Sequence, residues 1–86
     1  LAENEIELET NPIIFPNPAT HFISIDRSHF SDGNIQFSIS DISGKEVVKI
    51  SNLMKNKVDV SHLSSGLYFV NIDDEKQEIT KKLIIE

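Results

Sequence analysis

Apolar and polar residues alternate along most of the chain after residue 11, with the period of two that is typical of half-buried β-strands. The alternation is clear at Ile35, Phe37 and Ile39, and again at Leu83 and Ile85. No stretch keeps an apolar stripe at helical spacing without turn-forming residues, so we predict no helix. The pattern predicts seven strands, near residues 12–15, 21–27, 35–41, 46–51, 57–61, 66–72 and 78–85.

Turn-forming residues separate the predicted strands at intervals of about 8–12 residues. The run Asp-Gly-Asn at 32–34 predicts a hairpin, because these residues tolerate the positive φ of tight turns. Residues 41–45 predict a type I turn followed by Gly44 in the left-handed region, which lets strands 35–41 and 46–51 pair. We therefore predict an all-β fold, a single immunoglobulin-like β-sandwich of about seven antiparallel strands.

Charge is distributed unevenly along the 86 residues. The net charge is −6, and residues 1–9 contain four glutamates and no basic residue. We predict that residues 1–10 are an acidic flexible linker and that residues 11–86 form the folded domain. The alternation over 5–9 also fits an edge strand, but four like charges on one face would repel a neighbour. The acidic balance argues against nucleic acid as a partner, and the short apolar runs argue against direct membrane insertion.

Residue types that often act in catalysis or metal binding are present, but their spacing does not match the patterns that these functions require. The sequence has no cysteine, and its three histidines lack the spacing that directs two imidazoles at one metal ion. The acidic run at 73–75 lacks the spacing of a calcium loop. No serine lies in a Gly-x-Ser-x-Gly elbow. We predict that the chain is not an enzyme and has no catalytic residues, no metal site and no cofactor.

Aromatic residues mostly fall on positions expected to face the core. Phe22, Phe37 and Tyr68 are such positions, and the buried Tyr68 hydroxyl should find a partner in the backbone of a neighbouring loop. Phe30 and Phe69 are the exceptions. If both were exposed and adjacent, they would favour a surface that binds carbohydrate or protein.

Four segments together resemble one known family. They are Phe-Pro-Asn-Pro-Ala-Thr at 15–20 with the strand that follows it, the turn and strand at 39–48, the segment 58–70 that ends in Gly-Leu-Tyr-Phe-Val, and Lys-Lys-Leu-Ile-Ile-Glu at 81–86. Each motif alone is common. In this order and spacing, over residues 11–86, they resemble the C-terminal sorting domain (type A) of cargo proteins of the type IX secretion system in the Bacteroidota.

The resemblance implies roles for eight residues. Pro16, Asn17, Pro18 and Gly44 belong to the structural motifs, where the prolines fix φ and withhold amide donors. In the family, the last strand and its basic residues are part of what the outer-membrane machinery recognises. The implied recognition residues are Lys81 and Lys82, followed by Gly66 and Tyr68. A purely structural role is the alternative, because lysine on an exposed strand also protects a sheet edge.

The resemblance also implies a function. Such a domain follows a passenger in the same precursor and directs it across the outer membrane through the type IX translocon. The precursor would carry an N-terminal secretion signal, which this sequence does not show. The domain would fold in the periplasm, and a surface sortase-like cysteine protease would then remove it by cleavage within residues 1–11. The passenger would end on the cell surface or be secreted. A passive immunoglobulin-like binding or spacer module is the alternative function.

Overall fold

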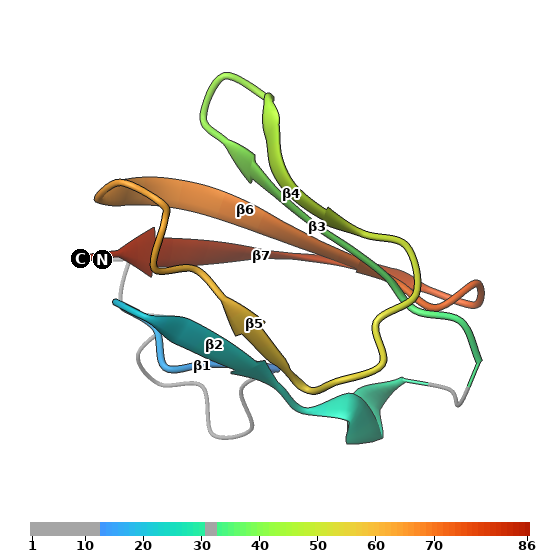
Figure 1. Cartoon of the computed structure of the whole chain (residues 1–86). Coiled ribbons are helices and arrows are strands. Elements are labelled where there is room, and N and C mark those ends of the chain that lie inside the picture. The colour runs from blue at the N-terminus through green and yellow to red at the C-terminus, as the bar shows by residue number, and fades with distance from the viewer. Residues whose placement is uncertain (1–12, 31–32) are drawn as a thin grey trace, which may run out of the picture.

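Two antiparallel sheets pack face to face to form the fold (Figure 1). The computed structural model describes residues 13–30 and 33–86. All seven predicted strands are present, each close to its expected bounds. They are β1 (Ile14–Phe15), β2 (Phe22–Ile25), β3 (Gln36–Asp41), β4 (Glu46–Ile50), β5 (Lys57–Asp59), β6 (Gly66–Asp73) and β7 (Glu78–Ile85). The predicted all-β sandwich is therefore confirmed. The predicted linker at 1–10 lies outside the described residues.

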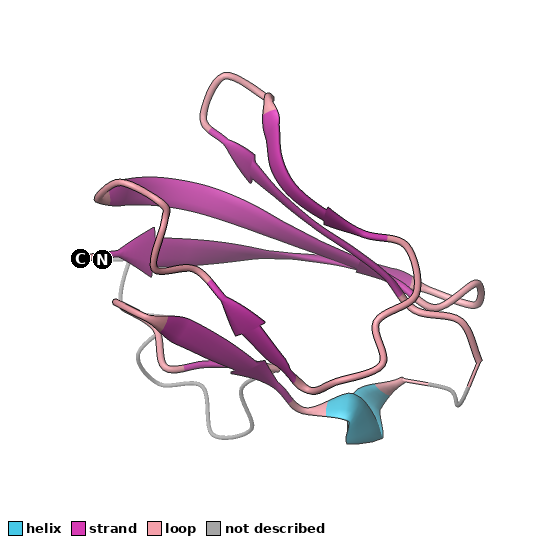
Figure 2. Ribbon diagram, viewed as in Figure 1, coloured by secondary structure: helices cyan, strands magenta, loops and turns pink. Residues whose placement is uncertain are grey.

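One short helical turn was not predicted. It is a 3-10 helix over Arg27–His29, shown in cyan in Figure 2. The side chain of Asp26 caps it by accepting a hydrogen bond from the Ser28 backbone N–H. Such a turn needs only a capping side chain and three residues, so it leaves no periodic signal in the sequence.

The prediction of a hairpin at 32–34 was wrong, because the strands on either side of it, β2 and β3, do not pair with each other. The sheet orders are β1-β2-β5 and β4-β3-β6-β7, so the chain changes sheets between β2 and β3. β2 ends at Ile25, and the 3-10 helix and Phe30 follow before the Asp-Gly pair. A tight hairpin requires both strands to reach the turn, and here neither does.

The hydrophobic core lies between the two sheets and follows the predicted alternation. In β3 and β6, every second side chain is buried. Phe37 and Tyr68 are buried as predicted. The prediction for Phe22 was wrong: it is exposed, because Ile23 and Ile25 occupy the inward positions of β2. Phe30 is buried and Phe69 is half-buried, so these two do not form an exposed aromatic surface.

The hairpin between β3 and β4 forms as predicted. Asp41 and Lys45 close it through a backbone hydrogen bond of 2.9 Å, and Gly44 has a φ of +92°. The Asp41 carboxylate accepts hydrogen bonds from the Ser43 hydroxyl at 2.6 Å and from two backbone N–H groups. A side chain at position 44 would have open space, because a Cβ there would meet no other part of the chain within 4 Å. The backbone conformation is therefore what favours glycine.

Two further turns repeat this Asp-x-Ser arrangement, at Asp26 and Asp59. In each of the three turns, hydrogen bonds from the serine hold the pKa of the aspartate below its usual value of 3.8. A lowered folded-state pKa means that the turn stabilises the fold above the unfolded-state value. That contribution is lost as the pH falls through the lowered value.

Tyr68 joins the core to the loop that precedes β6. Its ring is buried, and its hydroxyl donates a 2.7 Å hydrogen bond to the Ser64 carbonyl. This confirms the expected backbone partner in a neighbouring loop. A tyrosine near the start of the sixth strand that bonds back to the upstream backbone matches the tyrosine corner of immunoglobulin-like sandwiches.

We predict that Tyr68→Ala lowers the free energy of unfolding by about 3–5 kcal/mol, because it removes a buried aromatic ring. Tyr68→Phe should cost only about 0.5–1.5 kcal/mol, since it removes one hydrogen bond and keeps the ring. Urea unfolding of both variants measures the two values. Equal stability of the alanine variant and the wild-type domain would contradict a core role for this ring.

Candidate functional site

The Pro-Asn-Pro segment lies along the edge of β7 that faces away from β6. The Asn17 side chain donates a hydrogen bond to the Lys82 carbonyl at 2.9 Å and accepts one from the Ile84 N–H at 3.0 Å. The Ala19 N–H donates to the Ile84 carbonyl, and the Glu86 N–H donates to the Ala19 carbonyl, both at 2.8 Å. We call residues 16–19 with these hydrogen bonds the clamp.

Local chemistry explains why an asparagine makes this contact. A primary amide carries a donor and an acceptor, so one side chain pairs with an open strand edge as a peptide group would. Pro16 and Pro18 have no N–H of their own to offer. Asn17 is half-buried between them, and both prolines are exposed. The side chain thus supplies the pairing that the backbone of this segment lacks.

The clamp joins the two sheets at one edge of the sandwich. β1 and β2, on either side of it in the sequence, belong to the three-stranded sheet, whereas β7 belongs to the four-stranded sheet. The bridge between Ala19 and Ile85 is parallel, and Ala19 is fully buried. Two motifs from opposite ends of the described chain are therefore in direct contact.

The third motif meets them at the same place. The start of β6 pairs with the end of β7, so that Gly66 lies opposite Ile85 and Tyr68 lies opposite Leu83. Gly66 has a φ of +152°, which favours glycine although the space around it is open. Asp41 pairs with Tyr68 from the other side and places the Gly44 turn at this end too.

The four predicted recognition residues differ in how far their side chains are exposed to solvent. Lys82 is exposed and lies opposite Phe69, whereas Lys81 is half-buried and lies opposite the buried Val70. The two lysines alternate along β7 as expected for a regular strand. Tyr68 is buried and Gly66 has no side chain. Their role in recognition is still a prediction, and for these last two it would act through the fold.

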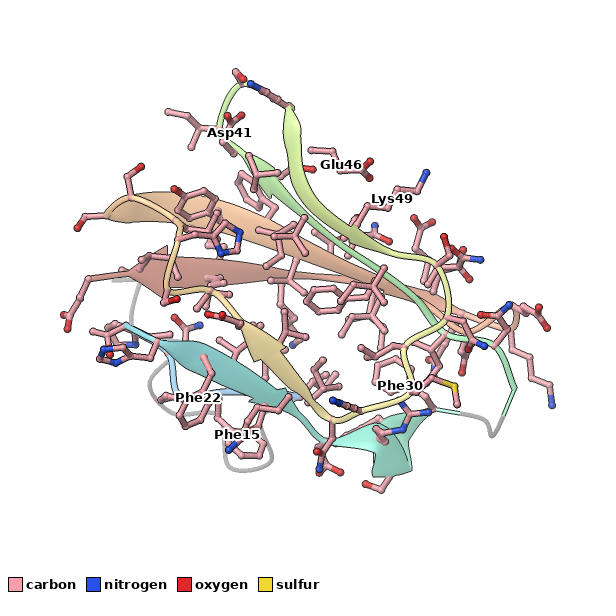
Figure 3. All side chains as sticks on the ribbon, viewed as in Figure 1. Phe15, Phe22, Phe30, Asp41, Glu46 and Lys49 are labelled. Carbon is pink, nitrogen blue, oxygen red and sulfur yellow. The ribbon has the colours of Figure 1, made fainter. Side chains whose placement is uncertain are left out.

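Exposed apolar side chains beside the clamp were not predicted. Phe15 and Phe22 lie on the outer face of the three-stranded sheet, as Figure 3 shows. Leu67 and Ile84 lie on the outer face of the four-stranded sheet. For the first pair, the alternation of side chains along the strands could have indicated exposure, because Ile14, Ile23 and Ile25 take the inward positions.

Among residues 13–30 and 33–86, no three histidine, aspartate or glutamate side chains are grouped so that they could hold a metal ion. The same part of the chain contains no helix that could cross a membrane. An open depression of about 530 Å³ near the Gly44 turn is lined by Asp41, Glu46, His62 and Tyr68, among others.

A known protein family matches most of this chain. The profile of the family described as the secretion system C-terminal sorting domain matches residues 13–86. The match includes the clamp, the start of β6 and the whole of β7. A comparison with curated proteins gave no match.

We predict that Asn17→Ala lowers the free energy of unfolding by about 1–3 kcal/mol, because two backbone groups of β7 lose their partner. In hydrogen exchange, the Ile84 amide should exchange faster, and by a larger factor than the Val70 amide at the centre of the sheet. Asn34→Ala, at an exposed asparagine, is the matched control. Unchanged Ile84 exchange in Asn17→Ala would show that the clamp does not hold β7.

Proposed function

Because the chain belongs to the family of secretion system C-terminal sorting domains, we propose that the type IX machinery recognises the end of the sandwich around the clamp. The family function is that of a C-terminal sorting signal for type IX secretion. Such a signal implies a passenger in the same precursor and transit of that passenger to the cell surface or the medium. The family is not a family of enzymes.

One observation supports this location above the others. The Asn17 side chain bonds to the backbone of Lys82 at 2.9 Å, and so joins the two motifs that lie farthest apart in the sequence. A binding partner at this edge therefore meets both motifs at once. A partner that recognised a single loop would contact only one of the two motifs.

We assign the recognition residues different roles within this surface. Lys82 is exposed and contacts the partner directly, and Lys81 contributes its charge from a half-buried position. Tyr68 positions the surface by anchoring the preceding loop through Ser64. Gly66 does so by letting the chain enter β6 with a positive φ.

The route of the passenger forms the finer part of the proposal. The domain folds in the periplasm, passes the translocon with its passenger, and is then removed by the surface sortase-like cysteine protease. Cleavage falls within residues 1–11, and residues 1–10 serve as the linker to the passenger. Two facts support this boundary: the family match begins at residue 13, and the clamp begins at Pro16. Exposed linkers are the preferred sites of proteolysis.

The passive binding or spacer module is disfavoured. That reading would gain if Phe30 and Phe69 were exposed and adjacent on one face. Phe30 is buried and Phe69 is half-buried, so the two rings do not form such a surface. The family match covers the whole described sandwich and points to sorting.

We predict that Lys81→Glu with Lys82→Glu lowers export of a passenger at least roughly tenfold, as reversed charges at an interface do. The melting temperature should stay within about 4 °C of wild type. The test uses a reporter with an N-terminal secretion signal, fused to residues 1–86 and expressed in a Bacteroidota strain. Lys49→Glu with Lys76→Glu is the control, because it makes the same charge change at two exposed lysines elsewhere.

The same reporter tests the function itself. Export that is lost in a strain with a defective type IX machine establishes the sorting signal. Retention of the wild-type reporter in both strains would overturn the proposal. Strong destabilisation of the Lys81 and Lys82 variant would show that these lysines act through the fold.

A further inference from the structure

Exposed apolar side chains are concentrated beside the clamp. Among the described residues, six large apolar side chains are exposed. Two of them, Ile42 and Met54, lie in separate loops. The other four form two pairs close to the clamp, one pair on each sheet. Clusters of this kind on a soluble domain mark interaction surfaces more often than isolated apolar residues do.

The first pair is on the three-stranded sheet. Phe15 and Phe22 are 42% and 41% exposed. Phe15 lies opposite Ser24, so Phe22 is its diagonal neighbour on the same outer face (Figure 3). The Lys57 amine sits 4.2 Å from the centre of the Phe22 ring. This pair therefore has an ammonium group on its border.

The second pair is on the four-stranded sheet. Leu67 and Ile84 are direct partners in the β6–β7 ladder and are 39% and 41% exposed. Lys82 precedes Ile84 by two residues, so it shares the outer face. It is exposed and lies opposite the half-buried Phe69. This pair also has an ammonium group on its border.

The clamp places both pairs at one edge of the sandwich. Asn17 bonds to the backbone of Lys82 and Ile84, which are part of the second surface. Phe15 directly precedes the clamp, and β2 begins at Phe22 shortly after it. The edge thus has apolar side chains and a lysine on each of its two outer faces, in a chain whose net charge is −6.

We propose that a component of the type IX machinery binds both outer faces of this edge at once, through a groove with apolar walls and a charged rim that places carboxylates opposite Lys57 and Lys82. The inference rests on the proposed function and extends it to Phe15, Phe22, Leu67 and Ile84. Three observations select this occupant. The second pair is continuous with the proposed recognition surface at Lys82, a lysine borders each pair with Asp59 also beside Phe22, and the clamp joins the two faces through hydrogen bonds. Apolar centres with charged rims are the usual anatomy of protein interfaces.

The test compares three double variants in the export reporter. Phe15→Thr with Phe22→Thr removes the first pair, and Leu67→Thr with Ile84→Thr removes the second. Ile42→Thr with Met54→Thr is the matched control at the two isolated apolar positions. Threonine keeps strand propensity at the outward positions. Thermal unfolding of each purified domain checks that it is folded at the temperature of the export assay.

We expect each pair variant to lower export at least roughly tenfold while the control exports normally, as expected when anchor residues are lost. If either pair variant exports like the control, binding at both faces is wrong, although the sorting function stands. If the wild-type reporter itself is not exported, the sorting function fails and this inference with it.

Photo-crosslinking provides a second readout that does not depend on variant stability. A photoreactive amino acid is placed at Phe22 or at Ile84 in the full reporter. We expect both positions to crosslink to the same component of the machinery, and neither to do so in the defective strain. Crosslinks to the passenger, or a dimer in analytical ultracentrifugation that the Phe15 and Phe22 variant abolishes, would assign the face to another partner and overturn the proposal.

Discussion

The pairing of Asn17 with the edge of β7 is the contact on which this end of the molecule depends. β7 is the last strand of its sheet, and its outer edge would otherwise present unpaired N–H and C=O groups next to exposed apolar side chains. The clamp satisfies this edge at Lys82 and Ile84 with one amide side chain and one short backbone bridge. It also joins the two sheets at this edge of the sandwich.

Because of this contact, residues that are distant in the sequence of the sorting signal lie next to one another in the folded domain. Two of the motifs that the family resemblance singles out, Pro16–Pro18 and Lys81–Lys82, lie near opposite ends of the matched segment, yet the fold brings them together at one edge. Tyr68 supports the same region from inside by holding the loop before β6. A surface built in this way exists only in the folded domain, so recognition of this surface would require the domain to be folded.

Strand positions were predictable from the sequence, whereas contacts between distant segments were not. Alternation at Ile35, Phe37 and Ile39 located β3, because side-chain parity is a local property. The hairpin expected at 32–34 was wrong because turn chemistry does not say which sheet the next strand joins. Pro16, Asn17 and Pro18 stood out as a motif, but their partner on β7 depends on tertiary structure. Phe22 was predicted to lie in the core and is exposed, because Ile23 and Ile25 take the inward positions of β2.

The most direct test of this account is the export of a reporter that carries Asn17→Ala, with Asn34→Ala as the control. The assay temperature is one at which circular dichroism shows both domains folded. If the clamp builds the recognised surface, export of the Asn17 variant falls although the fold persists. Normal export by a folded domain whose Ile84 amide has lost its protection would contradict the account.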